Sequence, residues 1–315
     1  MIERIFAEIG KKSNKKEWIC LAGQCDKVSI NSHFLQKNGI LKNLADQGFL
    51  VETKLTDPNH WKKTGPIEFK KIGINQALSL NVFCSNHDSN IFKSIEDFDS
   101  DLTSFKSFLL FSYRVTCAEL RKKQIHLDSY TQILEDERLD GKINKEKIES
   151  YCNGFYVGSI QLVRIKFIFE DEIRKNSNSF IYYSHVYEKI DVYASAIFSP
   201  IDDDEFNFDE FEQLQNVYIH VIPRVQDTLI LVGYHKDYST PWTESYVKSW
   251  GGLSRTELEF KLTDLFAERI ENWGMSNRLY KELKDENIHK YINYIKKSLV
   301  GNYKDLFVDF NLFEK

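Results

Sequence analysis

The sequence predicts an α+β protein, because long stretches with the apolar spacing of helices occur beside short stretches rich in β-branched and aromatic residues. The predicted helices of the larger, C-terminal part span residues 103–138, 145–175, 254–271 and 285–299. The predicted strands span residues 190–198, 217–222 and 228–234. Residues 223–227 form a short gap between the last two strands, which predicts a hairpin and hence a small antiparallel sheet.

A polar segment, Glu96–Asp101, is the expected boundary between two parts of the chain. A length of 315 residues corresponds to two domains at the usual size of roughly 100–200 residues each. We therefore expect an N-terminal domain of residues 1–100 and an α+β domain of residues 101–315. The first 93 residues contain 14 Lys and Arg against 9 Asp and Glu, whereas the rest contains 28 against 38. The N-terminal part is thus basic and the C-terminal part acidic.

The N-terminal part is expected to contain short elements. Residues 34–47 carry apolar side chains at helical intervals, which favours a helix there. Residues 53–66 contain two prolines and are expected to form a loop. The remaining expectations are a helix or strand at residues 1–12, strands at residues 18–21, 28–30 and 77–83, and the first turns of a helix at residues 89–97.

Composition and motif content exclude several classes of protein. The 23 Phe, 16 Tyr and 5 Trp residues supply ample apolar surface for a core, which excludes global disorder. Because no apolar run reaches about 18 residues and the first residues are charged, we expect neither a membrane span nor a signal peptide, and a cytoplasmic location. The odd number of cysteines, five, argues against a disulfide framework. Motifs for a phosphate-binding loop, a serine-hydrolase elbow and a His-Glu-x-x-His zinc site are absent from the sequence.

Four residues of the N-terminal part have the spacing of zinc ligands. Cys20 and Cys25 form a Cys-x4-Cys pair around a turn, and Cys84 and His87 form a Cys-x2-His pair. Structural zinc takes four such ligands, usually delivered as two close pairs on tight turns. The pattern therefore predicts a structural Zn²⁺ site.

Two alternatives to this ligand set stay open in the sequence. The four residues could be unrelated and lie in the same part of the chain by coincidence. A different histidine could also provide the fourth ligand in place of His87, with His33 as the main competitor and His60 as a remoter one.

Three short motifs of the N-terminal part occur in the order known from one nuclease family. They are Cys20-x4-Cys25, Ser32-His33, and the run from Phe83 to Asp88. In these motifs, residues 17–97 resemble a zinc-supported HNH-type (His-Me finger) nuclease module with a treble-clef fold. The resemblance implies that the two pairs of cysteine and histidine ligands hold structural zinc. It also implies that His33 is the general base that activates water for phosphodiester hydrolysis, and that Asp88 binds a catalytic Mg²⁺ or Mn²⁺.

The motifs also differ from the family pattern. Ser32 stands where Asp or His is usual, and Asp88 replaces a histidine. The central Asn of the family has two candidate counterparts, Asn43 and Asn75. The zinc ligands therefore match the family better than the catalytic residues do.

These observations predict a zinc-binding protein of nucleic-acid metabolism or anti-phage defence, with an HNH-like endonuclease site of degenerate motif. DNA or RNA would bind the basic N-terminal part, and residues 101–315 would bind a protein partner or form a homo-oligomer. The runs Ser32–Lys37, Gly73–Ala77 and Phe83–Asp88 also resemble bacterial proteins of similar size, some from anti-phage gene sets, which implies no defined activity. The alternative function is a non-catalytic, zinc-stabilised binding or assembly protein.

Overall fold

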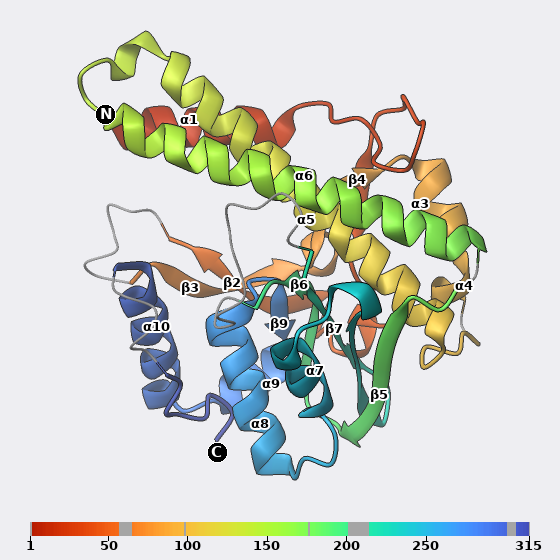
Figure 1. Ribbon diagram of the computed structural model, residues 1–315. Helices are drawn as coiled ribbons and strands as arrows, with labels where there is room; N and C mark the ends of the chain where they lie inside the picture. The colour runs from red at the N-terminus through yellow and green to blue at the C-terminus, as the bar shows by residue number, and fades with distance from the viewer. Residues whose placement is uncertain are drawn as a thin grey trace.

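A seven-stranded antiparallel sheet and two long helices organise the protein (Figure 1). The computed structural model describes residues 2–56, 65–97, 99–175, 177–200, 214–300 and 307–314. The strands of the large sheet lie in the order β3-β2-β9-β6-β7-β8-β5, and every neighbouring pair is antiparallel. A separate two-stranded sheet pairs β1 with β4. The predicted α+β class is therefore confirmed.

The three strands predicted from β-branched and aromatic residues are β6, β7 and β8, and their pairing includes the predicted hairpin. The sheet is nevertheless larger than predicted, because four more strands join it. The strands of the large sheet are β2 (Phe49–Leu55), β3 (Ile67–Gly73), β5 (Phe180–Glu188), β6 (Val192–Phe198), β7 (Val217–Pro223), β8 (Asp227–His235) and β9 (Trp273–Met275). Those of the small sheet are β1 (Ile30–His33) and β4 (Ser79–Phe83).

Both faces of the large sheet are covered, and alternate residues of its central strands enter two different cores. In β7, Tyr218 and Ile222 belong to the core on the side of the two long helices. Ile219 and Val221 belong to the core on the side of the C-terminal helices. The twofold alternation of side chains along a strand thus divides an almost wholly apolar strand between two hydrophobic layers.

The two long helices are α5 (Phe105–Glu135) and α6 (Lys145–Lys175), as predicted from their apolar spacing. Ser104 caps the start of α5, because its side chain accepts a hydrogen bond from the amide of Ser107. The chain reverses between the helices near Gly141, whose φ of 67° lies in the left-handed region that glycine adopts readily. No helix in the described ranges combines the length and apolar character needed to cross a membrane.

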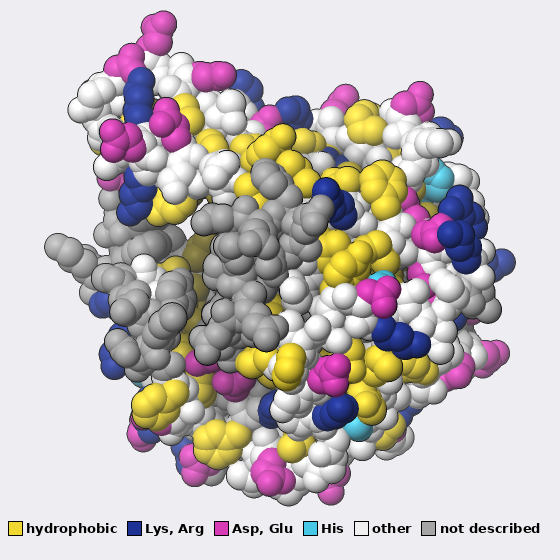
Figure 2. Space-filling model, viewed as in Figure 1, with side chains coloured by type: hydrophobic (Ala, Val, Ile, Leu, Met, Phe, Trp, Pro, Cys, Tyr) yellow, Lys and Arg dark blue, Asp and Glu magenta, His cyan; other side chains and the backbone are white. Residues whose placement is uncertain are grey.

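Helix α1 (Ile2–Lys15) lies beside the end of α5 and the start of α6 (Figure 1). A small separate core holds this three-helix arm together. Its buried residues are Ile5, Ile9, Ile133, Leu139 and Ile148. On the face of the molecule shown in Figure 2, Lys and Arg side chains are interspersed with Asp and Glu side chains.

The C-terminal helices cover the other face of the sheet, as the cores and Figure 1 both show. The predicted helix at residues 254–271 is α8 (Arg255–Asp264), continued by a π-helical turn at Leu265–Arg269. The predicted helix at residues 285–299 is α10 (Asp285–Val300). The short helices α7 (Pro241–Lys248) and α9 (Asn277–Glu282) complete this layer.

Both predicted parts of the chain contribute strands to the large sheet. In β2, Val51 pairs with Met275 of β9, and β9 in turn pairs with β6. Residues 49–73 therefore join a sheet whose other strands come from residues 180–275. The large sheet therefore crosses the predicted boundary near residue 100. The division of the chain into two domains with different roles stays a prediction.

Several local predictions for the N-terminal part were wrong. Residues 34–47 form turns and one 3₁₀ helix, Leu41–Asn43, in place of the predicted helix. The apolar side chains of Leu35, Leu41 and Leu44 are nevertheless buried. Their helix-like spacing therefore reflects burial in a segment that is not a regular helix. The predicted loop at residues 53–66 overlaps the end of β2, and residues 57–64, with His60, lie outside the described residues. Residues 18–21 contribute a single bridge, Ile19 to Val28, in place of a strand.

Candidate metal centre

The loop that carries Cys20 and Cys25 is held closed by its own backbone. Its two arms meet at the bridge between Ile19 and Val28, and the amide of Cys20 donates to the carbonyl of Lys27 at 2.8 Å. At its tip, Gln24 adopts a φ of 57°, which completes the reversal of the chain. The reversal brings the sulfurs of both cysteines to the same side of the loop.

The second ligand pair lies where β4 passes into the short helix α3 (Ser85–Ile91). Cys84 is the N-cap residue, in extended conformation, and His87 follows it in the first turn of the helix. The amide of His87 donates to the sulfur of Cys84, and this lowers the pKa of that thiol. A 3.0 Å hydrogen bond from the amide of Leu21 to the carbonyl of Val82 joins the cysteine loop to β4, so the two pairs meet.

The four ligand atoms form a compact group. Nδ1 of His87 lies 3.4 Å from Sγ of Cys20 and 3.5 Å from Sγ of Cys84. The sulfurs of Cys25 and Cys84 are 3.9 Å apart, and all four atoms lie within 4.8 Å of one another. With the usual zinc–sulfur and zinc–nitrogen distances, a tetrahedron has edges of ~3.8 Å between sulfurs and ~3.6 Å between sulfur and nitrogen. The donor set and its spacing therefore fit a Zn²⁺ ion.

The same geometry excludes a disulfide between Cys25 and Cys84, since bonded sulfurs are only about 2.05 Å apart. All five cysteines of the chain are free thiols. Burial raises the pKa of Cys20 to about 11, although amides of Cys84 and Ala22 donate to its sulfur and act in the opposite direction. A divalent cation favours the thiolate form of such a ligand, because metal binding releases the thiol proton.

His33 lies outside this group and makes a separate contact. It ends β1, and its Nε2 is 3.0 Å from the carbonyl oxygen of Ile74. A carbonyl can only accept, so Nε2 carries the proton and Nδ1 of the neutral ring keeps its lone pair. Burial lowers the pKa of His33, Lys37 and Arg114 lower it further, and Asp88 acts in the opposite direction. The neutral ring is thus favoured at pH 7.

Asp88 lies on α3 directly after His87 and faces a buried guanidinium. Nη2 of Arg114, on α5, is 3.5 Å from Oδ1 of Asp88 and 2.6 Å from Oε1 of Glu96. The Arg114 side chain is 1% exposed and stacks on Phe92 at 3.9 Å from the ring centroid. A catalytic cation would need these carboxylates as ligands, but they already face the positive charge of Arg114.

Ser32, which replaces an expected cation ligand of the resembled family, points into the protein. Its hydroxyl accepts a 3.3 Å hydrogen bond from the amide of Phe83 and donates to the carbonyl of Ile30 at 3.4 Å. The Ser32 side chain therefore forms a hydrogen bond between β1 and β4.

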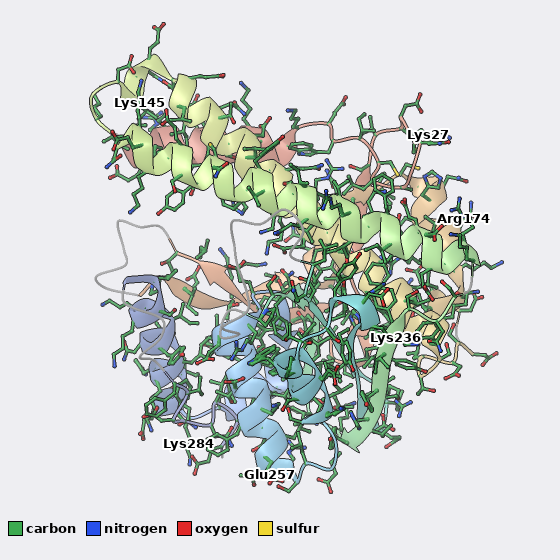
Figure 3. The ribbon with its side chains drawn as sticks, viewed as in Figure 1. Lys27, Lys145, Arg174, Lys236, Glu257 and Lys284 are labelled. Carbon is green, nitrogen blue, oxygen red and sulfur yellow. The ribbon has the colours of Figure 1, made fainter. Side chains whose placement is uncertain are left out.

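A groove of about 580 Å³ opens beside the metal centre, between the start of β1 and α3. Its lining contains one lysine, two exposed aliphatic residues, hydrogen-bonding side chains of α3 and no carboxylate among the described residues. The lining residues are Lys27, Val28, Ile30, Cys84, Ser85, Asn86, Ser89 and Asn90. Lys27 lies beside the bridge between Ile19 and Val28 that closes the cysteine loop (Figure 3).

The sequence prediction missed the residues that surround the centre from the long helices. Glu170 accepts a 3.2 Å hydrogen bond from the amide of Gly23, inside the cysteine loop. Arg121 donates to the carbonyl of Ile19. No spacing pattern in the sequence distinguishes these two residues from the other charged residues of α5 and α6.

Taken together, the structure brings Cys20, Cys25, Cys84 and His87 into one group and leaves His33 outside it. Comparison of the chain with models of protein families, with curated proteins and with solved structures found no match.

Proposed function

We propose that this chain is a zinc protein that acts on nucleic acid, with a structural Zn²⁺ held by Cys20, Cys25, Cys84 and His87. The proposal is carried by one observation, the convergence of three thiols and an imidazole within 4.8 Å. The order of cysteine loop, two-stranded sheet and helix supports the resemblance to the HNH-type treble clef. Bound zinc would hold together two segments that are far apart in the chain and close the long loop between them.

The hydrolytic part of the proposal assigns His33 as a general base. The hydrogen bond from Nε2 to the carbonyl of Ile74 orients the ring and leaves Nδ1 able to take a proton. Burial favours the neutral, basic form, since it lowers the pKa of His33. In this proposal His33 accepts a proton from the water that attacks a phosphodiester of DNA or RNA. Asp88 would bind the Mg²⁺ or Mn²⁺ that neutralises charge on the phosphate.

A second function, a non-catalytic binding or assembly protein, is favoured by Arg114. Its guanidinium already pairs with Glu96 and lies 3.5 Å from Asp88, and a divalent cation beside it would meet electrostatic repulsion. Ser32 faces inward and offers no replacement ligand. In this version nucleic acid binds the groove and Lys27 without being cleaved.

The cellular setting is part of the proposal. Free thiols at all five cysteines support a reducing compartment such as the cytoplasm. A role in bacterial anti-phage defence rests on the sequence resemblance alone.

Metal analysis of the purified protein tests the zinc centre. We expect about one zinc per chain, lost in Cys84→Ser and kept in Cys152→Ser, whose thiol lies far from the centre on α6. Zinc-free wild-type protein, or equal loss in both variants, would contradict the centre.

Cleavage assays on DNA and RNA with Mg²⁺ or Mn²⁺ separate the two functions. The nuclease proposal expects cleavage that is abolished in His33→Ala at unchanged zinc content, with His126→Ala of α5 as the matched control. Salt-sensitive binding without cleavage would select the binding protein. Loss of zinc in His33→Ala would show that His33 supports the metal centre and is not a separate base.

A further inference from the structure

Arg121 is a buried cation next to the cysteine loop. It lies on α5 with 1% of its surface exposed, and its guanidinium sits 4.8 Å from the ring centroid of Trp18. One of its terminal nitrogens donates to the carbonyl of Ile19, the residue before Cys20. Its Nε is buried and has no hydrogen-bond partner within the described residues.

Within the described ranges, no carboxylate forms an ion pair with Arg121. The carboxylate of Glu170, which accepts from the cysteine loop, is paired with Lys166 at 2.7 Å. The titratable groups whose ionised forms would interact favourably with the guanidinium are the thiols of Cys117 and Cys20. Burial lowers the pKa of Arg121 to about 10, so the group remains protonated at neutral pH. A buried charge without compensation is strongly destabilising.

The metal centre would supply the missing negative charge. Three thiolates and a neutral imidazole around a divalent ion leave one net negative charge on the centre. The sulfurs would share that charge, and two of them, those of Cys20 and Cys84, belong to buried residues. In a medium of low dielectric constant, such a centre and a guanidinium attract each other strongly.

We infer that Arg121 is the built-in counter-ion of the zinc–thiolate centre, so that zinc binding and burial of this arginine stabilise each other. The inference rests on the zinc centre proposed above. It assigns Arg121 a positioning and charge-balancing role, because its hydrogen bond also fixes the backbone next to Cys20.

Two substitutions separate charge from hydrogen bonding. Arg121→Gln removes the charge and keeps an amide that can donate to Ile19, whereas Arg121→Lys keeps the charge. We expect zinc affinity, measured by competition with a coloured chelator, to fall roughly 10–100-fold in Arg121→Gln and to change much less in Arg121→Lys. Lys123→Gln is the matched control, because it removes a positive charge from the more exposed side of the same helix.

A double-mutant cycle gives a sharper test. Cys25→His would make the centre electrically neutral, so the counter-ion would have nothing to balance. We then expect Arg121→Gln to weaken zinc binding in the wild-type background and to have little effect in the Cys25→His background. An equal effect of Arg121→Gln in both backgrounds would mean that Arg121 acts through packing or hydrogen bonding, and would overturn the inference.

The outcomes also distinguish this inference from the proposed function. If wild-type protein binds no zinc, the zinc centre itself fails. If wild-type protein binds zinc and Arg121→Gln binds it equally well, the centre stands and the counter-ion role is wrong. Substitution of Co²⁺ for zinc provides a check on folding, because Co²⁺ in tetrahedral thiolate coordination absorbs visible light. We expect Arg121→Lys to retain this absorption.

Discussion

The amide of Gly23, at the tip of the loop between Cys20 and Cys25, donates a 3.2 Å hydrogen bond to Oε1 of Glu170 on α6. The same oxygen accepts from the hydroxyl of Tyr113 at 2.8 Å and from Nζ of Lys166 at 2.7 Å. One carboxylate of a long helix therefore contacts the cysteine loop, the other long helix and a buried lysine at once. The position of the cysteine loop thus depends on how the two long helices pack.

Replacing Glu170 tests this dependence. In Glu170→Ala, the amide of Gly23 and the ammonium of Lys166 both lose their partner, so we expect the free energy of unfolding to fall by roughly 2–4 kcal/mol. Urea denaturation of the zinc-loaded protein measures the change. Glu149→Ala, an exposed position of the same helix, should change the free energy of unfolding by less than about 0.5 kcal/mol. Equal effects of the two substitutions would contradict the proposed role of Glu170.

Glu52, like Glu170, should stabilise the fold, because it joins the N-terminal part of the chain to the large sheet. Its side chain is 4% exposed, and its Oε1 accepts from the amide of Leu78 at 2.9 Å and from the hydroxyl of Tyr193 at 3.1 Å. Glu52→Ala leaves two buried donors without a partner, at a cost of about 1–3 kcal/mol each. We expect a lower midpoint of urea denaturation, a smaller loss in Glu52→Gln, and little change in the exposed control Glu68→Ala on β3. A wild-type midpoint in Glu52→Ala would exclude this role.

His220 predicts a loss of stability in acid. It is fully buried between α5 and the sheet, with Nε2 3.0 Å from Oγ of Ser112 and Nδ1 2.9 Å from Oγ of Ser195. Burial lowers its pKa to about 3 from an ordinary value of 6.5. Between these two pH values the unfolded chain binds a proton that the folded protein does not, so the free energy of unfolding decreases as the pH falls.

The free energy of unfolding should fall by ~2 kcal/mol at pH 5 because of His220, since this pH is about 1.5 units below the pKa of the unfolded histidine. His220→Gln should be less stable than the wild type at pH 7 but should lack this part of the pH dependence. Urea denaturation of both proteins at pH 7 and pH 5 measures the difference. Parallel losses in the two proteins would show that His220 does not titrate on unfolding.

The proposed base His33 makes a prediction about the pH dependence of cleavage. Because its pKa is lowered below the ordinary value of 6.5, the neutral ring predominates at pH 7, and the rate should begin to fall only below pH 6.5. Lys37 contributes to the lowering through its charge. Lys37→Gln should therefore raise the pKa of His33 and move the acidic limb of the rate profile to higher pH. A limb that stays in place, or moves to lower pH, would argue against His33 as the base.

Local patterns in the sequence were sufficient for several features. The spacing of apolar residues predicted α5, α6, α8 and α10, and β-branched runs predicted β6, β7 and β8. The pairs Cys20–Cys25 and Cys84–His87 could be recognised because each pair lies within one turn of the chain. In all these cases the information lies in neighbouring residues, which share one helix face, strand or turn.

Other features depend on contacts between distant segments. Residues 49–73 carry no alternating pattern strong enough to reveal β2 and β3. The two strands pair with each other, and β2 also pairs with β9, which comes from the far end of the chain. Residues 34–47 have helix-like spacing but do not form the predicted helix, because their apolar side chains reach the core from turns and a short 3₁₀ helix.

The amino-acid order alone therefore determined α5, α6, α8 and α10, the strands β6, β7 and β8, and the two pairs of candidate ligands. Only the folded chain decided that the pairs converge, that His33 stays apart from them, and that Arg121 and Glu170 flank the cysteine loop. The physical reason is that a single charged residue in a long helix has no spacing signature, and its partner is set by how that helix packs.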